Sequence, residues 1–239
     1  MKYINGAYQS HLFTGIPGLV HGYSSRELGD ARKPEYAKTF VKRITGKDAK
    51  MLRASQVHGA SVALVGADSP EIIPEADGMV TADKSIVLEV HVADCVPLLL
   101  VDPVAKISAV AHAGWRGTFG RIARNTVDKM RDAGAVAENI RVSVGPHIGR
   151  CCYVVDEARA QSFLNEFGFD ERIAGVSEGG WHLDLGFVNR NELLAAGITE
   201  EHIDAPVTCT SCQIDNFFSY RKDTKETFGE IIGIVGYMN

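Results

Sequence analysis

The hydrophobic positions of the chain follow two periodicities, one typical of strands and the other typical of helices. Short apolar or alternating runs bounded by turn residues predict strands, at 85–91, 96–101, 107–111, 140–144 and 231–237. The run VPLLLV at 96–101 is apolar at every position. Such a run is typical of a strand that is buried on both faces.

Three further segments carry apolar residues at the helical spacing of three and four. The first runs from Phe119 to Met130 and can end at Gly134, because glycine commonly closes a helix. Asp156 and Asp184 are suited to cap the other two, since their carboxylates accept hydrogen bonds from free N–H groups of a first turn. The mixture predicts a sheet protein with covering helices.

Composition narrows this picture. The 239 residues are 45% hydrophobic and 23% charged, and no repeat or linker divides them, so we expect a single domain over residues 1–239. The net charge of -5 disfavours nucleic acid and anionic membranes as partners. No signal peptide and no bilayer-spanning run is visible, so a cytoplasmic protein is expected. The odd number of cysteines, five, predicts reduced thiols.

The segment richest in candidate chemistry is 93–120, which begins ADCVPLLLVD and ends AVAHAGWRGTFG. Cys95 enters one predicted strand and His112 leaves the next. Turn-forming residues at 102–106 favour an antiparallel hairpin between these two strands. In a hairpin the two residues lie at the same edge of the sheet, where a thiolate and an imidazole could share a metal ion.

A third ligand is available at His58, in the segment SQVHGA, where Gly59 lets the backbone approach a site. Two imidazoles and one thiolate leave a fourth zinc position for water or substrate, as in catalytic sites. Spacing alone leaves this ligand set open, because histidines and cysteines also occur in cores and on surfaces. Asp94 could orient His112 or His58 from behind, or it could cap a turn.

The order of motifs closely resembles the YfiH/YlmD family. The matching segments include HGYSSR, QVHG, ADGMVT, ADCVPLLL, AHAGWRGT, GPHIGRCCYVV and FFSYR. This family, formerly called multicopper polyphenol oxidase or laccase-domain proteins, is now regarded as purine nucleoside phosphorylases and includes human FAMIN as a relative. The resemblance implies an α+β fold, a single four-layer domain with packed mixed β-sheets covered by helices.

The resemblance also implies a site and an activity. It assigns Zn²⁺ to His58, Cys95 and His112, with Cu²⁺ as the alternative ion. It implies phosphorolysis of inosine and adenosine, with adenosine deamination and methylthioadenosine phosphorolysis as further activities. Cys95, His112, Asp94 and Arg116 are then the catalytic candidates. The partners would be purine nucleosides and phosphate, in a monomer or weak homodimer that binds no nucleic acid and no membrane.

Arg116 stands before a helix expected to begin near Thr118. A guanidinium at a helix N-terminus suits phosphate. The alternative is a structural salt bridge between Arg116 and Asp94 or Asp77. Asp77 itself is expected in a turn.

Other candidate substrate contacts flank these motifs. Arg221 in FFSYR could hold phosphate, or it could be a surface arginine at a strand end. Arg53 and Gln56 flank the His58 segment and could face the same cleft. Trp115 could stack on a purine, although tryptophan is commonly part of a core.

The remaining cysteines receive no metal role. Cys209 and Cys212 form a lone CTSC without a second pair nearby, so a closed four-cysteine zinc site is not expected, and a redox role is the alternative. Cys151 and Cys152 are adjacent and precede an apolar run, which favours burial.

Three other functions compete with phosphorolysis. Copper-dependent phenol oxidation could use a His₂Cys site, but a multicopper oxidase needs many more histidines than the eight present. A cysteine hydrolase could use Cys95 as nucleophile and His112 as base. A non-catalytic metal-binding or interaction protein is the last alternative.

Overall fold

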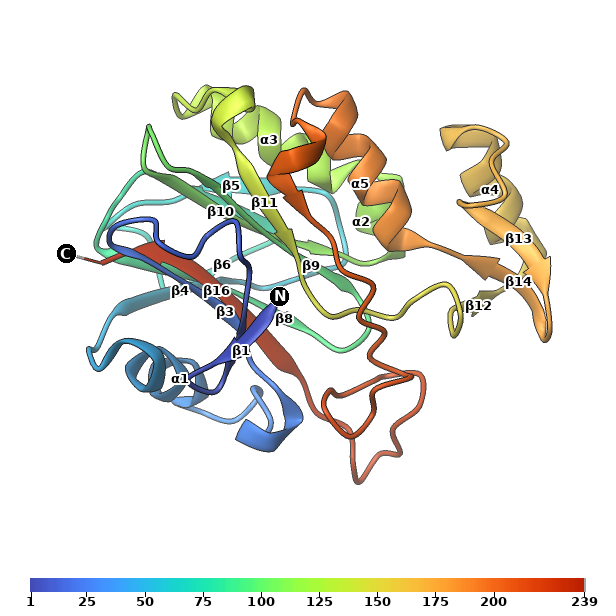
Figure 1. The fold of residues 1–239 in the computed structure, drawn as a ribbon, viewed down its shortest axis with the longest axis horizontal. Helices are drawn as coiled ribbons and strands as arrows, with labels where there is room; N and C mark the ends of the chain where they lie inside the picture. Colours follow the sequence, from blue (N-terminus) through green and yellow to red (C-terminus); the bar gives the residue numbers. More distant parts are fainter. Residues whose placement is uncertain (239) are drawn as a thin grey trace.

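Two large β-sheets, packed face to face, form the centre of the molecule in the computed structural model, which describes residues 1–238 (Figure 1). The first sheet has the strand order β1 (Lys2–Ile4), β2 (Ala7–Gln9), β3 (Leu19–Tyr23), β16 (Ile231–Tyr237), β8 (Ile86–Val92), β4 (Lys50–Ala54) and β6 (Ile72–Ile73). The second has the order β15 (Ile203–Asp204), β11 (Arg141–Val144), β9 (Val96–Asp102), β10 (Ile107–Ala113), β7 (Gly78–Thr81) and β5 (Val62–Leu64). Both sheets are mixed, because parallel pairs such as β4–β8 and β5–β7 join antiparallel ones.

Helices cover the outer face of each large sheet, and one further helix packs on a small third sheet. Their bounds are α1 (Tyr36–Thr45), α2 (Trp115–Phe119), α3 (Ile122–Asp132), α4 (Glu157–Phe167) and α5 (Leu185–Ala195), with short 3₁₀ turns η1 (Arg26–Leu28), η2 (Ala137–Asn139) and η3 (Glu200–His202). Helix α1 lies on the first sheet, whereas α3 and α5 lie on the second (Figure 1). The small sheet of β12 (Val154–Val155), β14 (Gly180–Leu183) and β13 (Ala174–Ser177) extends to one side with α4. The four-layer α+β architecture with mixed sheets is thereby confirmed.

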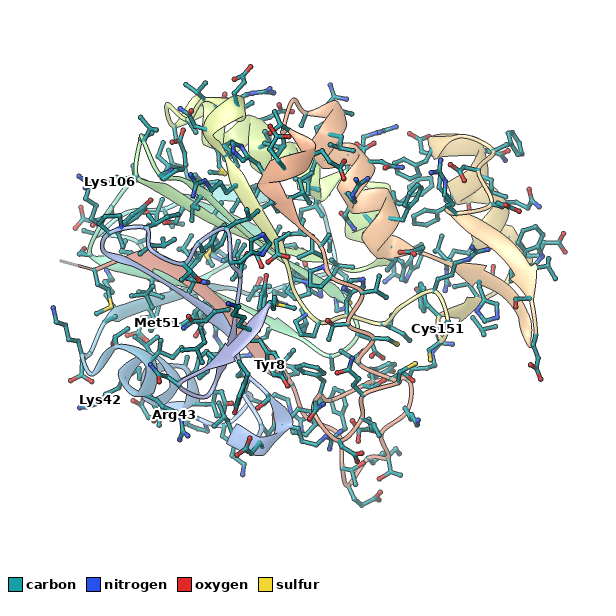
Figure 2. The ribbon with its side chains drawn as sticks, viewed as in Figure 1. Tyr8, Lys42, Arg43, Met51, Lys106 and Cys151 are labelled. Carbon is teal, nitrogen blue, oxygen red and sulfur yellow. The ribbon has the colours of Figure 1, made fainter. Side chains whose placement is uncertain are left out.

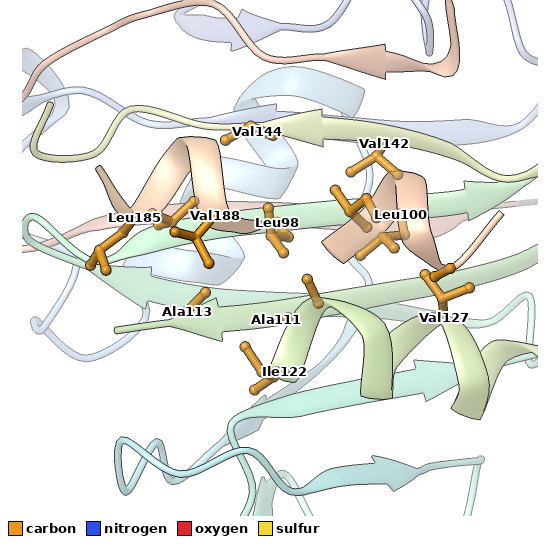
Figure 3. Close-up of a cluster of buried hydrophobic side chains, with 14 of the residues drawn as sticks. Leu98, Leu100, Ala111, Ala113, Ile122, Val127, Val142, Val144, Leu185 and Val188 are labelled. Carbon is orange, nitrogen blue, oxygen red and sulfur yellow. The ribbon is translucent and has the colours of Figure 1, made fainter. Parts of the chain in front are cut away.

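Strand β9 runs through the middle of the second sheet, and its side chains alternate between two cores. Leu98 and Leu100 point toward α3 and α5 (Figure 3), whereas Leu99 and Val101 point between the two sheets. All four are fully buried. This double burial explains why the run VPLLLV shows no alternation of polar and apolar residues. Each such side chain contributes about 1.5–3 kcal/mol through burial.

The predicted hairpin of β9 and β10 is confirmed. The strands are antiparallel, with Asp102 opposite Ile107 and Pro97 opposite His112. The Asp102 carboxylate accepts hydrogen bonds from the N–H groups of Val104 and Ala105, which closes the turn. The local sequence thus fixes the pairing that positions the site residues.

The helix predictions need one correction. The Phe119–Met130 segment is not one helix, because Arg121 adopts a left-handed backbone conformation (φ 61°) that separates α2 from α3. Both predicted caps are confirmed, since Asp156 and Asp184 accept hydrogen bonds of 2.8 Å from the third residue of the following helix. Among residues 1–238, no helix combines the length and the apolar character needed to cross a membrane.

Candidate functional site

The side chains of His58, Cys95 and His112 converge at one end of the central hairpin. Cys95 directly precedes β9, His112 lies near the end of β10, and His58 is on the loop after β4. Their ligand atoms all lie within 4.8 Å of one another, a spacing at which they could hold one metal ion. The two imidazole rings meet edge to face, with centroids 4.8 Å apart. His112 is buried, Cys95 is half-buried and His58 is exposed.

A buried carboxylate, Asp77, connects the two histidines. Its Oδ1 lies 2.8 Å from His112 Nδ1 and accepts the His58 N–H at 2.9 Å, while Oδ2 accepts the Gly59 N–H at 2.7 Å. A partner on Nδ1 leaves Nε2 of His112 as the nitrogen available to a ligand-binding site. Asp77 was expected in a turn. The sequence did not reveal that its carboxylate lies behind both histidines.

Two glycines of the HAGWRG motif allow this close convergence. A Cβ on Gly114 would stand 3.0 Å from Cys95 Sγ and 3.3 Å from His58 Cδ2. A Cβ on Gly117 would stand only 2.7 Å from the Gly59 carbonyl oxygen. A side chain at Gly117 would therefore clash with the backbone of the His58 loop, and one at Gly114 would crowd Cys95 and His58.

The three side chains and Asp77 alter one another's proton affinity. Burial raises the pKa of Cys95, but hydrogen bonds from His112 and His58 outweigh burial and lower this pKa to about 7. Burial lowers the pKa of His112, but Asp77 and Cys95 together raise it to about 9. The Cys95–His112 pair therefore readily yields the thiolate, which is the form that binds a metal or attacks a substrate.

The site opens into a cleft with a volume of about 620 Å³. Four arginines from separate parts of the chain line it: Arg53, Arg116, Arg159 and Arg221. Such a concentration of guanidinium groups is unexpected in a chain with a net charge of -5. It favours an anionic ligand, because each guanidinium can bind two oxygens of one anion.

Comparison with known proteins identifies the family. A sequence model described as multi-copper polyphenol oxidoreductase laccase matches residues 27–238. The chain belongs to this family. The resemblance to YfiH and YlmD, predicted from the motifs, is confirmed.

Individual relatives agree with this assignment. The chain is 38% identical over 192 residues to a purine nucleoside phosphorylase, YlmD, of Geobacillus stearothermophilus, covering 76% of the chain and 70% of the relative. It is 39% identical over 148 residues to a protein named adenosine deaminase RL5 from an unknown prokaryotic organism, covering 61% of the chain and 56% of the relative. The crystal structure of the Geobacillus YlmD resembles it with a TM-score of 0.82 at 30% identity, over 96% of the chain and 94% of that structure.

Of the two roles considered for Asp94, the structure does not support the one behind a histidine, because Asp77 occupies that position at His112. Asp94 lies beside Cys95 and lines the cleft, but its carboxylate faces the C-terminal loops and contacts neither histidine ring. It accepts hydrogen bonds from Thr210 Oγ1 at 2.6 Å, Ser219 Oγ at 3.1 Å and the Arg221 N–H at 2.7 Å. Asp94 thus anchors the loop that carries Arg221.

Gln56 lines the cleft, but its amide is already engaged. Its Nε2 donates to the His91 carbonyl oxygen at 2.7 Å, and its Oε1 accepts the His91 N–H at 2.8 Å. The predicted substrate contact thus has both side-chain groups occupied by the backbone of β8. Arg53, from β4, lines the cleft as predicted.

Arg116 also differs from its prediction. Helix α2 begins at Trp115, not near Thr118, because extended Gly114 turns the chain directly from β10 into the helix. In the described part of the chain Arg116 forms no salt bridge with either suggested aspartate, and its guanidinium lies 4.6 Å from the centre of the Trp115 ring. The Arg159 guanidinium lies 4.3 Å from the same ring. Trp115 therefore supports two arginines, which leaves it poorly placed to stack on a purine.

Sequence reasoning missed several cleft residues. Arg159 comes from α4 and Tyr153 from the loop before β12, and neither lies near His58, Cys95 or His112 in the sequence. Tyr220 also lines the cleft, and 74% of its surface is exposed. Its position directly before Arg221 in FFSYR was the available signal.

The other four cysteines are also brought together, contrary to prediction. Cys151 is exposed rather than buried, and the Cys151–Cys152 pair lies against the Cys209–Cys212 pair. The second pair that a four-cysteine site requires is therefore present, although it is distant in sequence.

Proposed function

We propose that this protein is a zinc-dependent purine nucleoside phosphorylase that acts on inosine and adenosine, with methylthioadenosine as a further substrate. The observation that carries the proposal is the convergence of His58, Cys95 and His112 at the base of a cleft lined by four arginines. The name of the Geobacillus relative supports the substrate class. A monomer or weak homodimer in the cytoplasm stays a prediction.

In this proposal the arginines bind inorganic phosphate. Arg53, Arg116 and Arg221 are exposed to the cleft from three different elements, so their guanidinium groups can surround one anion. A phosphate oxygen forms the new bond to C1′ of the ribose while the C1′–N9 bond breaks. The purine leaves with the bonding electron pair and takes up a proton, and the second product is ribose 1-phosphate.

Tyr220 is our candidate for contact with the purine. The residue is 74% exposed and lines the cleft, and its ring meets the Phe228 ring at 83°. An exposed aromatic face can stack on a base, an interaction that contributes about 1–3 kcal/mol.

The side chains at the base of the cleft fit a zinc ion. Cys95 with a lowered pKa supplies a thiolate, and the Asp77 contact to His112 Nδ1 directs Nε2 toward the shared site. His58, Cys95 and His112 would hold the ion, and its open position would supply a Lewis acid for an oxygen of the substrate or water. The family description suggests copper, and the His₂Cys set would also accept Cu²⁺.

Adenosine deamination is the second candidate activity. It is favoured by the relative named adenosine deaminase and by a three-ligand site, since hydrolytic deaminases use zinc with an open position. Phenol oxidation is disfavoured. Among residues 1–238 a single cluster of potential metal ligands contains histidine, whereas a multicopper oxidase needs several.

The decisive assay incubates the purified protein with inosine in the presence and absence of phosphate. We expect hypoxanthine and ribose 1-phosphate only when phosphate is present. Base release without phosphate would contradict phosphorolysis, and activity that survives complete metal removal would favour a cysteine hydrolase. Adenosine incubated without phosphate tests deamination separately, because inosine and ammonia would then be the products.

A further inference from the structure

Four cysteines lie together on two loops outside the cleft. Cys151 and Cys152 are on the loop between β11 and β12, and Cys209 and Cys212 are on the loop between β15 and β16. Figure 2 shows Cys151 on its loop, near the long loop that precedes β16. The Cys212 Sγ lies 3.5 Å from both the Cys151 Sγ and the Cys152 Sγ, and all four sulfur atoms lie within 4.8 Å of one another.

Backbone N–H groups hold one of these sulfurs, Cys209 Sγ, in place. The Gly149 N–H donates to Cys209 Sγ at 3.2 Å, and the Cys212 N–H donates to the same sulfur. A Cβ on Gly149 would stand 3.2 Å from Cys209 Cβ and 3.3 Å from Cys151 Sγ, so even a methyl group here would crowd the cluster.

We propose that Cys151, Cys152, Cys209 and Cys212 bind one zinc ion as a closed, four-thiolate structural site. Zn–S bonds of about 2.3 Å in a tetrahedron separate the sulfurs by roughly 3.8 Å, close to the spacing observed here. Binding displaces the protons of the thiols and leaves no position for substrate. Cys209 and Cys212 have the CxxC spacing typical of structural zinc sites, and the adjacent Cys151 and Cys152 supply the other two ligands from a second segment.

The position of this site indicates its role. The two loops also meet through a parallel bridge between His147 and Cys209. Thr210, next to Cys209, donates a hydrogen bond to Asp94, which in turn accepts the Arg221 N–H. An ion held by the four cysteines would therefore fix the loop on which Arg221 reaches the cleft. It would stabilise that loop without taking part in chemistry.

The test counts metal in the full-length chain after reconstitution with zinc under reducing conditions. We expect two ions per chain in the wild type, one for each cluster. Cys212→Ser should retain one, and Cys95→Ser, which leaves the four-cysteine cluster intact, should also retain one. Cobalt bound to the Cys95→Ser protein should show the intense sulfur-to-cobalt absorption of four thiolates. This readout does not depend on any enzymatic activity.

Three results would overturn the proposal. The first is a Cys95→Ser protein that binds no zinc. The second is a Cys212→Ser protein that binds as much zinc as the wild type. The third is an intact mass, measured after zinc loading, that shows a disulfide among these cysteines. If Cys212→Ser does not fold, the cobalt spectrum and zinc content of Cys95→Ser decide the question alone.

Discussion

The two cysteine-containing clusters differ in ligand type, in openness and in the residues behind them. The cleft cluster has one thiolate and two imidazoles, and Asp77 orients one imidazole from behind. The loop cluster has four thiols, and one of them, Cys209, accepts a hydrogen bond from the Gly149 N–H. Three ligands facing a cleft suit chemistry on a bound molecule, whereas four ligands fill a tetrahedron. The presence of cysteine alone does not separate a candidate reactive centre from a candidate structural one. The number of ligands and the residues around them do.

The clusters are nevertheless connected. Asp94 follows Ala93 in the chain, directly before Cys95, and its carboxylate accepts a hydrogen bond from Thr210, directly after Cys209. Asp94 also has a left-handed backbone conformation (φ 85°), which is uncommon for aspartate. Asp94 therefore connects the loop that carries Cys209 to the residue beside Cys95 at the edge of the cleft.

The largest predicted effect comes from metal removal. A chelator should reduce phosphorolysis by more than about 100-fold, because loss of an ion should exceed the roughly 10–100-fold effect of losing a residue that orients a ligand. Added Zn²⁺ should restore the rate. The ion of the loop cluster should leave more slowly, since four thiolates enclose it. Simultaneous measurement of activity and metal content checks this order, and loss of both ions before any loss of activity would contradict it.

Asp77→Asn should lower kcat by roughly 10–100-fold, because the His112 ring loses the carboxylate that orients it. The metal content of the loop cluster should be unchanged. Steady-state kinetics together with a metal count provide the measurement. Asp83→Asn, at an exposed turn, is a matched control that should behave as the wild type. Equal kcat values for Asp77→Asn and this control would show that Asp77 does not orient His112 for catalysis.

Asp94→Asn should weaken the binding of phosphate and leave the binding of the metal unchanged. Its carboxylate accepts three hydrogen bonds, including that of the Arg221 N–H, and one such bond contributes about 1.5 kcal/mol. The KM for phosphate should rise roughly ten-fold while the zinc of the cleft is retained. A loss of zinc with an unchanged KM would instead restore a role for Asp94 behind the histidines.

His91 should have the smallest effect on turnover, but a measurable effect on stability. Burial lowers its pKa, whereas Glu230, 3.4 Å from Nδ1, and Glu89, 3.6 Å from Nε2, raise it to about 8. Because the folded state binds the proton more tightly, this stabilisation is complete below pH 6.5 and is lost as the pH rises through 8. It amounts to about 2 kcal/mol.

Denaturant titrations of wild type and His91→Gln at a series of pH values test this contribution. The variant should be less stable at pH 6, and the difference should narrow by pH 9. A difference that is the same at all pH values would show that His91 is neutral in the folded protein. Neither cysteine cluster should change its metal content in this variant.

The parts of the fold that depend on neighbouring residues could be predicted from the sequence. The β9–β10 hairpin follows from two apolar runs and a turn, and it brings Cys95 and His112 to one edge. Asp156 and Asp184 cap their helices because capping depends on residues three positions away. Such signals lie within one short window of sequence.

The contacts between distant loops could not be predicted in this way. Asp77 meets His112 only because β7 pairs with β10, and the Cys151 and Cys209 pairs meet only through two loops that lie far apart in the chain. Spacing therefore indicated Asp94, the sequence neighbour of Cys95, in place of Asp77, the spatial neighbour of His112. The family resemblance supplied His58, which spacing alone left open.

The central claim is that the cleft cluster takes part in the reaction, whereas the loop cluster only stabilises the loop that carries Arg221. It is tested most directly by measuring inosine phosphorolysis at saturating phosphate for Cys95→Ser and Cys212→Ser side by side, with zinc counted in each. Each variant should lose one ion. Cys95→Ser should lose nearly all of its kcat, whereas Cys212→Ser should keep a kcat close to that of the wild type. The account would be contradicted if Cys95→Ser still catalysed phosphorolysis, or if a folded Cys212→Ser protein that retained the cleft zinc did not.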